Sequence, residues 1–423
     1  MKRDHICFAI LLFLLLIAPE VPLGVIHISG PELSSFSIAF IGLLFWLLIS
    51  PMSILRLRKR LSWGVLVVFF ALYGWMISLI SGNLLSILYS LQYFFYTILG
   101  FLIIRTYFLK SLKLNEFHKI SQVFIIIGIF FSLGILVSVI IGPIYPHQTQ
   151  WTQRMVEDIF IQRGVGFTEN PNVAGGIQIF FLAASIFLYP SGARYQRIAT
   201  AIMAFGLLLT LSRSAILSFI AAALALVCIW FMRAMLAGKI NYRLAYRLTT
   251  YVFLVCIIPI ILMALFQGDF GALGPDPSGK IILGLGLSNY ASIGEDASTR
   301  LELWNCGIRN WINQGALEAF FGVGFHNSNI LNEYGVFSTP HNFYVNVLGD
   351  FGVVGFFFIF LALMGPLAKA CSKLFANPKR SGIFSFSFLT IASLCIHNMT
   401  GEFLYSQKYI LLFLFSILVL EVE

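Results

Sequence analysis

Charged residues are scarce in this chain: Asp, Glu, Lys and Arg make up 11% of its 423 residues, whereas 59% are hydrophobic. Soluble domains carry about 25% charged residues, so the composition excludes an ordinary soluble protein. Cysteine is also rare, with six residues and no CxxC pair, which excludes a disulfide framework and a cysteine-based zinc site. What the chain has in abundance is long apolar runs, and about 20 apolar residues let a helix cross a bilayer.

These runs predict an all-α membrane protein with about twelve transmembrane helices. The predicted spans are 7–24, 33–50, 63–80, 84–104, 121–142, 171–190, 197–211, 214–232, 248–266, 342–366, 382–398 and 408–421. The basic N-terminus resembles a signal peptide, but no small-residue cleavage site follows it, so the first run is interpreted as a helix. We expect a single polytopic domain over residues 1–423.

The net charge of +9 is explained by topology. With the N-terminus inside, most of the 27 basic residues fall in the connections that then face the cytoplasm. Cytoplasmic loops of membrane proteins are enriched in Lys and Arg, so both termini are predicted to be cytoplasmic and the membrane to be a bacterial inner membrane. The charge therefore does not indicate a nucleic-acid partner, and none is expected.

Two predicted periplasmic segments are too long to be simple turns. The shorter covers 143–170, and the larger, 267–341, is expected to carry part of an active site. In the larger one, Thr299-Arg-Leu-Glu302 matches a capping box. Apolar residues at helical spacing follow it, from Leu301 to Ile312. The pattern predicts an amphipathic helix that starts after Thr299 and lies against the membrane face or the helix bundle.

A few arginines depart from the cytoplasmic bias. Arg213 sits between two apolar runs, where Ser212 is a suitable N-cap for the following helix. Arg300 repeats this arrangement after its own capping residue. An Arg beside the free N–H groups of a first helical turn suits phosphate or pyrophosphate. Alternatively, each Arg pairs with a nearby acidic residue such as Glu169 or Glu302.

Arg163 is a third exception, in the segment Arg163-Gly-Val-Gly-Phe-Thr-Glu-Asn-Pro-Asn172. Asn170 followed by Pro171 predicts the N-cap and first position of the next membrane helix. The glycines let the backbone approach a ligand closely, or they simply make turns.

His341 is the most informative histidine. Thr339 can cap the next membrane helix and Pro340 can occupy its first position, which would place His341 in the first turn. The positive helix end would lower the pKa of His341 and keep the imidazole neutral, available as a base. Gly352 lies eleven residues on, and we expect it on the same helical face. By topology, His341 shares the outer membrane level with the three exceptional arginines, and the sequence leaves open whether the four converge on one site.

A family resemblance rests on these residues. His341-Asn342, nine residues and then Gly352-Val-Val-Gly355 resemble the HN-x9-GxxG pattern of the O-antigen ligase superfamily. The superfamily includes lipopolysaccharide ligases, O-antigen polymerases and bacterial O-oligosaccharyltransferases. Arg300 with Trp304, and then Gly322-Val-Gly324, are similar to the family's loop segment ahead of the histidine.

The resemblance implies an enzyme, a glycosyltransferase that takes its glycan from undecaprenyl pyrophosphate and transfers it in the periplasm. The implied acceptor of the favoured reading, an O-antigen ligase, is a lipid A–core sugar. By the resemblance, His341 is the base, and Arg213 with Arg163 or Arg300 holds the pyrophosphate. Direct displacement would invert the anomeric configuration, and neither a cofactor nor a metal is expected.

Two alternatives stay open. An O-antigen or exopolysaccharide polymerase would use the same donor and the same residues with a different acceptor pocket. A transporter or lipid flippase predicts inverted repeats and ionisable residues near the bilayer midplane. The sequence has no detectable internal repeat, which disfavours transport.

Overall fold

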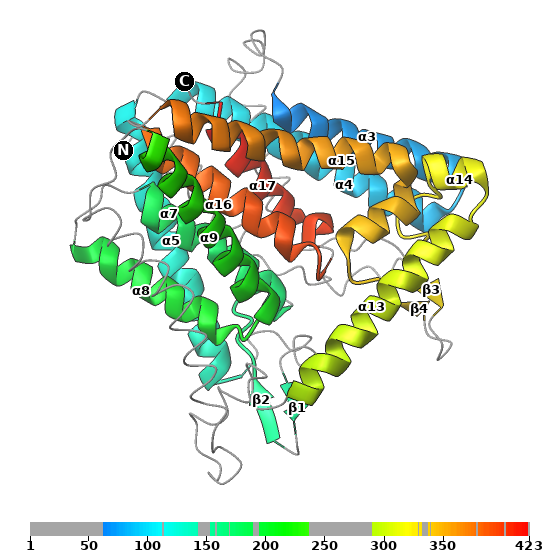
Figure 1. Ribbon diagram of the computed structural model, residues 1–423, viewed down its shortest axis with the longest axis horizontal. Coiled ribbons are helices and arrows are strands. Elements are labelled where there is room, and N and C mark those ends of the chain that lie inside the picture. The colour runs from blue at the N-terminus through cyan, green and yellow to red at the C-terminus, as the bar shows by residue number, and fades with distance from the viewer. Residues whose placement is uncertain are drawn as a thin grey trace, which may run out of the picture. The chain divides into compact units, whose positions relative to one another are not determined.

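The computed structural model shows how these segments fold (Figure 1). The residues that it describes are 62–111, 114–142, 153–156, 159–168, 170–188, 194–236, 290–328, 330–331, 337–338, 340–377, 380–401 and 403–421. The predicted spans 7–24, 33–50 and 248–266 lie outside the described residues.

Every predicted span within the described residues is helical. The helices are α3 (Trp63–Ser81), α4 (Leu84–Ser111), α5 (Leu114–Ile140), α7 (Pro171–Phe187), α8 (Arg194–Leu209), α9 (Arg213–Leu236), α13 (Tyr290–Asn313), α14 (Ala316–Phe321), α15 (Phe343–Ala376), α16 (Ser381–His397), the 3-10 turn η6 (Phe403–Tyr405) and α17 (Gln407–Val419). Five of them, α3, α4, α5, α9 and α15, contain stretches long and apolar enough to cross a membrane. The chain is a multi-pass membrane protein, and the twelve-helix topology with its periplasmic loops stays a prediction.

Two short strand pairs were not anticipated from the sequence. Strand β1 (Gln153–Val156) pairs antiparallel with β2 (Ile159–Gln162). Strand β3 (Ile330–Leu331) pairs in the same way with β4 (Phe337–Ser338). Both pairs lie in the segments predicted to be loops, so the all-α prediction describes the helices well and misses these hairpins.

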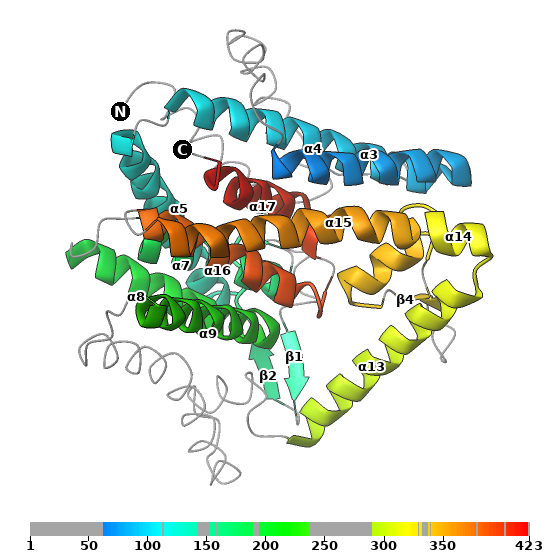
Figure 2. The same cartoon turned by 45° about the horizontal axis from the view of Figure 1, so that its top comes forward.

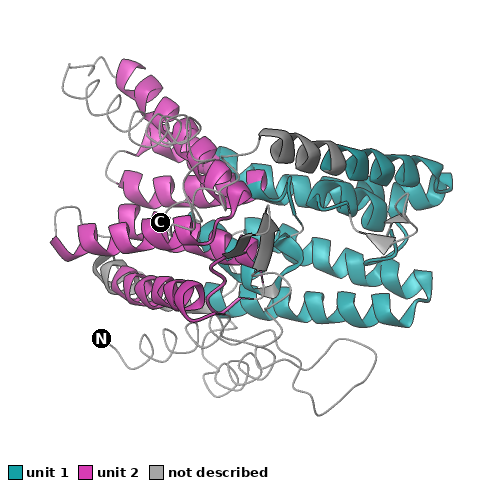
Figure 3. Cartoon of the chain, turned by 90° about the horizontal axis from the view of Figure 1, so that it is seen from below, with its two compact units in different colours: residues 1–120, 296–368, 397–423 teal, residues 121–295, 369–396 magenta. Residues whose placement is uncertain are grey.

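The chain divides into two compact units, coloured separately in Figure 3. Unit 1 comprises residues 1–120, 296–368 and 397–423. Unit 2 comprises residues 121–295 and 369–396. Arg300 and His341 therefore belong to unit 1, whereas Arg163 and Arg213 belong to unit 2.

In unit 1 the hairpin of α3 and α4 supports the other helices. Gly82 closes α3 in the left-handed conformation, with φ of 71°, which a residue without a Cβ adopts at little cost. Helix α17 packs against α4 and α3, and Leu411 of α17 occupies the space beside Gly100 of α4. In the core, Phe70 packs edge-on against Tyr93 and Phe351, which joins the hairpin to α15.

Helix α15 is broken at Gly352, where φ is 63° and ψ is −167°. In Figures 1 and 2 its first turns leave the axis of the longer part. The backbone at the end of α14, at Phe320 and at Gly322 just after the helix, fills the space where a Cβ on Gly352 would stand. The N–H of Gly324 then donates to the carbonyl of Asp350 at 2.8 Å. Because the helix is interrupted, the expectation that Gly352 shares a helical face with His341 was wrong.

In unit 2 helix α7 packs against both α8 and α9. The contact with α9 is close because Gly175 has no side chain: a Cβ there would lie 2.6 Å from Ala215 Cβ and 3.2 Å from Ser212 Cβ. The first turns of α7 and α9 therefore lie side by side.

Helix α13 begins at Tyr290, ten residues before the predicted start at Arg300. The capping-box prediction was wrong: Thr299 lies inside the helix, and Arg300 is not in its first turn. Once a helix has started, each further residue adds one hydrogen bond for the residue fixed, so it propagates through a capping-type residue.

The break in α15 gives a direct test. Gly352→Ala should lower the thermal unfolding midpoint of the purified protein, because this backbone region costs a residue with a side chain about 1–3 kcal/mol and the new Cβ would meet the carbonyl of Phe320. Val353→Ala is the matched control, since Val353 is exposed on the adjacent position of α15. Equal midpoints for the Gly352 variant and the wild type would contradict the crossing.

Candidate functional site

His341 stands immediately before α15, not in its first turn. The helix begins at Phe343, and the N-cap is Asn342, whose Oδ1 accepts from the N–H of Tyr344 at 2.9 Å and of Val345 at 3.3 Å. Pro340 precedes the helix, so the predicted start was wrong by several residues. Asn is among the strongest N-cap residues, and the second residue of the His-Asn motif thus fixes where the helix starts.

The backbone of His341 is strained. Within the described part of the chain, three residues other than glycine have positive φ: Leu211 at 50°, His326 at 56° and His341 at 50°. Such conformations are uncommon outside glycine, although histidine adopts them more readily than most residues. They persist where the surrounding structure over-determines them, often at functional sites. Leu211 directly precedes Ser212, His341 directly precedes Asn342, and the N–H of His326 donates to Asp350.

Arg300 and His341 interact electrostatically within unit 1. The pKa of His341 is lowered from its usual value of 6.5, first because the protein around the ring reduces its solvation and second because Arg300 is positively charged. The direction is the one expected from the sequence, but the causes differ from the helix end invoked there. The Nη1 of Arg300 donates to the carbonyl of Thr400 at 3.0 Å.

The turn that contains Thr400 also holds the start of α15. The N–H of Phe343 donates to the carbonyl of Asn398 at 3.0 Å and to that of Gly401 at 3.1 Å. The turn at residues 398–401 therefore contacts both Arg300 and Phe343, the first residue of α15. These hydrogen bonds position Arg300 and the helix start beside His341 relative to each other.

His397, at the end of α16, is a residue that the sequence analysis missed. It is buried, and its ring packs against Phe403 with 3.8 Å between centroids. The hydroxyl of Tyr409 lies 3.5 Å from its Nδ1, and the charge of Arg300 acts on this ring as well. The available signal was the polar pair His397-Asn398 at the end of an apolar helix, but a lone pattern of that kind does not distinguish a site from a helix end.

Asp350 is a buried carboxylate inside α15. Its Oδ1 accepts from the N–H and the Oγ of Ser328, at 3.1 and 2.6 Å. Its Oδ2 accepts from the N–H of His326 at 3.1 Å and from the hydroxyl of Tyr405 at 3.4 Å. A buried charge is tolerated when it is hydrogen-bonded in this way. Asp350 therefore holds the segment after α14 against α15.

In unit 2 the arginine side chain of Arg163 reaches the turn before α9. Its Nη2 lies 3.3 Å from Asn172 Oδ1 and 3.4 Å from the carbonyl of Leu211. The same Asn172 Oδ1 accepts from Ser212 Oγ at 2.7 Å. Arg163 and the residues directly before Arg213 are thus joined through one amide oxygen.

The predicted caps in this unit are confirmed. Asn170 is the N-cap of α7, with Pro171 in the first turn. The Oγ of Ser212 accepts from the N–H of Ala215 at 3.3 Å, so Ser212 caps α9 and Arg213 is its first residue. The first turns of two adjacent helices therefore meet beside two arginines.

The glycines after Arg163 pack against α5 and make a turn. The space beside Gly164 is occupied by Ile135 and by the carbonyl of Leu209. The N–H groups of Val165 and Gly166 both donate to Ser138 Oγ at 3.0 Å. Of the two readings left open by the sequence, the structure supports the packing and turn role.

The structure thus brings the predicted residues together in pairs. Arg300 and His341 form one pair in unit 1, with His397 beside them, and Arg163 and the Arg213 turn form the other in unit 2. Whether all four residues converge on one site stays open, as it was from the sequence. Among the residues with defined positions, no group of three or more His, Cys, Asp or Glu is arranged to hold a metal ion.

Residues 198–360 of the chain match the family model described as O-Antigen ligase. The matched span contains Arg213, Arg300, His341 and both motif glycines, whereas Arg163 precedes it. The match supports the resemblance to the O-antigen ligase superfamily that the His-Asn and glycine motif carries, and it supports a ligase-like or polymerase-like glycosyltransferase activity in general. A comparison with curated proteins gave no significant match.

Proposed function

We propose that this chain, with its O-antigen ligase segment over residues 198–360, transfers a glycan from undecaprenyl pyrophosphate to a lipid A–core sugar. The reaction takes place at the periplasmic face of the inner membrane and inverts the anomeric configuration. It requires neither a cofactor nor a metal ion.

The observation that carries the proposal is the environment of His341. A partly exposed imidazole with a lowered pKa stands beside a guanidinium group, Arg300, that is anchored to the same turn as the helix start. A base must be neutral at the working pH and must lie near the group that it deprotonates. This combination suits the removal of a proton from an acceptor hydroxyl next to an anionic donor.

The donor's pyrophosphate is assigned to the arginines. In unit 2, Arg163 and Arg213 accompany the N-terminal turns of α7 and α9, and the positive ends of the helix dipoles at such turns attract phosphate. A guanidinium group adds a two-pronged donor for phosphate oxygens. Arg300, in unit 1, is assigned to pyrophosphate binding by the family resemblance.

In the proposed step, the acceptor hydroxyl oxygen attacks the anomeric carbon of the donor sugar. The bond from this carbon to the pyrophosphate oxygen breaks, and its electron pair leaves with undecaprenyl pyrophosphate. His341 takes the hydroxyl proton, and the arginines stabilise the charge that develops on the leaving oxygen. One displacement from the opposite side produces inversion, and atoms and charges balance without another reactant.

A strain that lacks this gene separates ligase from polymerase. For a ligase, lipopolysaccharide on a gel should lose all long chains while lipid-linked polymer accumulates, because the acceptor transfer is missing. A core that carries one repeat would indicate a polymerase instead. Complementation with the wild-type gene is the control, and lipopolysaccharide unchanged by the deletion would refute both activities.

His341→Ala should lower kcat by about 10²–10⁴-fold, which is the usual contribution of a general base. Donor affinity should change little, because the arginines hold the pyrophosphate. Arg213→Ala is the contrasting variant and should weaken donor binding. Both are measured on purified protein with lipid-linked donor, by transfer rate and by binding. Near wild-type turnover of the His341 variant would remove this residue from the chemistry.

The charge of Arg300 should be visible in the pH profile. The base works when it is neutral, so kcat/KM falls as the pH drops through the pKa of His341. Arg300→Gln removes the positive charge that lowers this pKa; the pKa should therefore rise and the acid limb should move to higher pH. Arg309→Gln, an exposed position on the same helix, is the control and should leave the limb in place. An unmoved limb in the Arg300 variant would contradict the pairing.

A further inference from the structure

Helices α13 and α14 expose a set of large apolar side chains. Their exposed fractions reach 61% at Ile312 and 72% at Leu317. We call the set the apolar strip; it consists of Leu301, Ile308 and Ile312 on α13 and Leu317 and Phe320 on α14. Large contiguous apolar surface on a protein usually indicates a partner or a membrane.

On α13 the apolar strip is one of three distinct sides. Each residue of an α-helix turns by about 100°, so Leu301, Ile308 and Ile312 fall within about 40° of one another around the axis. Arg300 and Gly307 point to a second side, roughly a quarter-turn away. The sequence analysis had grouped the leucine, isoleucine and tryptophan residues of this helix together, and the structure separates them.

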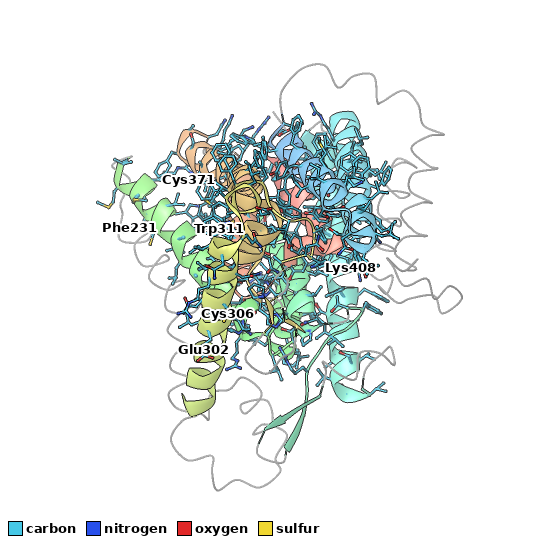
Figure 4. All side chains as sticks on the ribbon, turned by 90° about the vertical axis from the view of Figure 1, so that its right-hand side faces the viewer. Phe231, Glu302, Cys306, Trp311, Cys371 and Lys408 are labelled. Atoms are coloured by element: carbon cyan, nitrogen blue, oxygen red, sulfur yellow. The ribbon has the colours of Figure 1, made fainter. Side chains whose placement is uncertain are left out.

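The second side faces the body of unit 1. Gly307 packs against Val345 and Pro340, and Arg300 reaches Thr400. Trp311, the farthest along α13 of the residues labelled on this helix in Figure 4, donates its indole N–H to the carbonyl of Ala319 at 2.9 Å. These contacts fix the rotation of α13, and with it the direction in which the apolar strip points.

The third side is polar. Glu302 and Arg309 are both exposed, and they lie across the helix from Arg300 by the same turn of about 100° per residue. The apolar strip therefore lies between the side that faces the protein and the side that carries charge. A helix that lies in the plane of a membrane surface has this arrangement, with apolar residues toward the acyl chains and charged residues toward water.

The end of the apolar strip adjoins a candidate membrane span with exposed apolar residues. The carbonyl of Phe320 lies against Gly352 of α15, and the residues that follow on this candidate span, Val353 and Phe357, are exposed. Exposed apolar residues on a span face the acyl chains of the bilayer. In Figures 1 and 2, α14 lies at the end of α3 and α15, and the hydroxyl of Tyr73 in α3 donates to the carbonyl of Phe321 at 2.7 Å.

We propose that the apolar strip docks on the surface of the bilayer leaflet in which α15 begins, with its side chains at the boundary between headgroups and acyl chains. The occupant is lipid, because the strip adjoins a candidate membrane span and is bordered by charge. One consequence rests on the proposed function: docking holds Arg300, on the neighbouring side of α13, at the depth where the pyrophosphate of a membrane-bound donor lies.

Spin labelling of the full chain tests the docking without any turnover. In a protein whose native cysteines are replaced, Ile308→Cys and Arg309→Cys each receive a nitroxide and are reconstituted into vesicles of phosphatidylethanolamine and phosphatidylglycerol. The label at 308 should be accessible to oxygen, which dissolves in lipid, and protected from a water-soluble nickel chelate. The label at 309, one residue further around the helix, should show the reverse.

Three outcomes would overturn the docking. Equal exposure of both labels to the nickel chelate would place the apolar strip in water. Protection of label 308 from both reagents would show that protein covers it, and spin–spin broadening would then identify a second copy of the chain. Lipid-like accessibility of both labels would mean that the whole helix is immersed.

The consequence for the donor has its own test. Ile312→Glu should raise the KM for lipid-linked donor, because it lifts α13, and Arg300 with it, away from the lipid in which the donor lies. Ile312→Leu keeps the apolar character and is the matched control. An unchanged KM would overturn the role in donor binding, whereas the spin-label pattern would still report the docking itself.

Discussion

The interruption of α15 at Gly352 is the constraint on which the unit 1 site depends. The backbone after α14 passes so close to α15 that neither Gly322 nor Gly352 has room for a Cβ. This crossing divides α15 into a short first part and a long membrane span. The short part starts at its cap, Asn342, and His341 directly precedes that cap. The two ends of the His-Asn and glycine motif therefore act on the same short helix: Gly352 ends it, and His341 stands at its start.

Helix N-termini position the proposed site residues in both units. Asn170, Ser212 and Asn342 cap α7, α9 and α15 with their side chains. In a bilayer every backbone donor needs a partner, and the first turn of a helix is where donors remain free. An arginine or a histidine stands beside each of these ends, and anionic substrates are the partners that such ends attract.

Buried polarity inside the helices has a different role from polarity at their ends. Asp350 accepts hydrogen bonds from four donors of the protein. These hydrogen bonds hold the segment 322–328 against α15. The pair Arg300 and His341 shares one turn of the chain and retains electrostatic coupling. The arrangement around Asp350 suits a structural role, whereas that of Arg300 and His341 suits a reaction. The proposed docking of the apolar strip, which lies on the same helix as Arg300, would bring this pair close to the lipid that contains the donor.

Local patterns in the sequence were sufficient for much of this protein. The spans from 63–80 to 408–421 that fall in the described residues are helical, because length and apolarity decide a membrane helix with little help from the rest of the chain. Asn170 and Ser212 cap their helices as expected, since a cap is an interaction between residues two or three positions apart. The His-Asn and glycine motif was enough to indicate the superfamily whose family model matches residues 198–360.

Contacts between residues far apart in sequence decided the rest. The start of α15 is stabilised by the carbonyls of Asn398 and Gly401, more than fifty residues away, and the break at Gly352 by the passing backbone of Phe320. His397 came next to Arg300 through the same distant turn. Capping strength and helical spacing are properties of a short segment, so they can be read from the sequence. The choice between two possible starts of α15 depends on hydrogen-bond acceptors that are distant in sequence, and only the folded structure shows which residues these are.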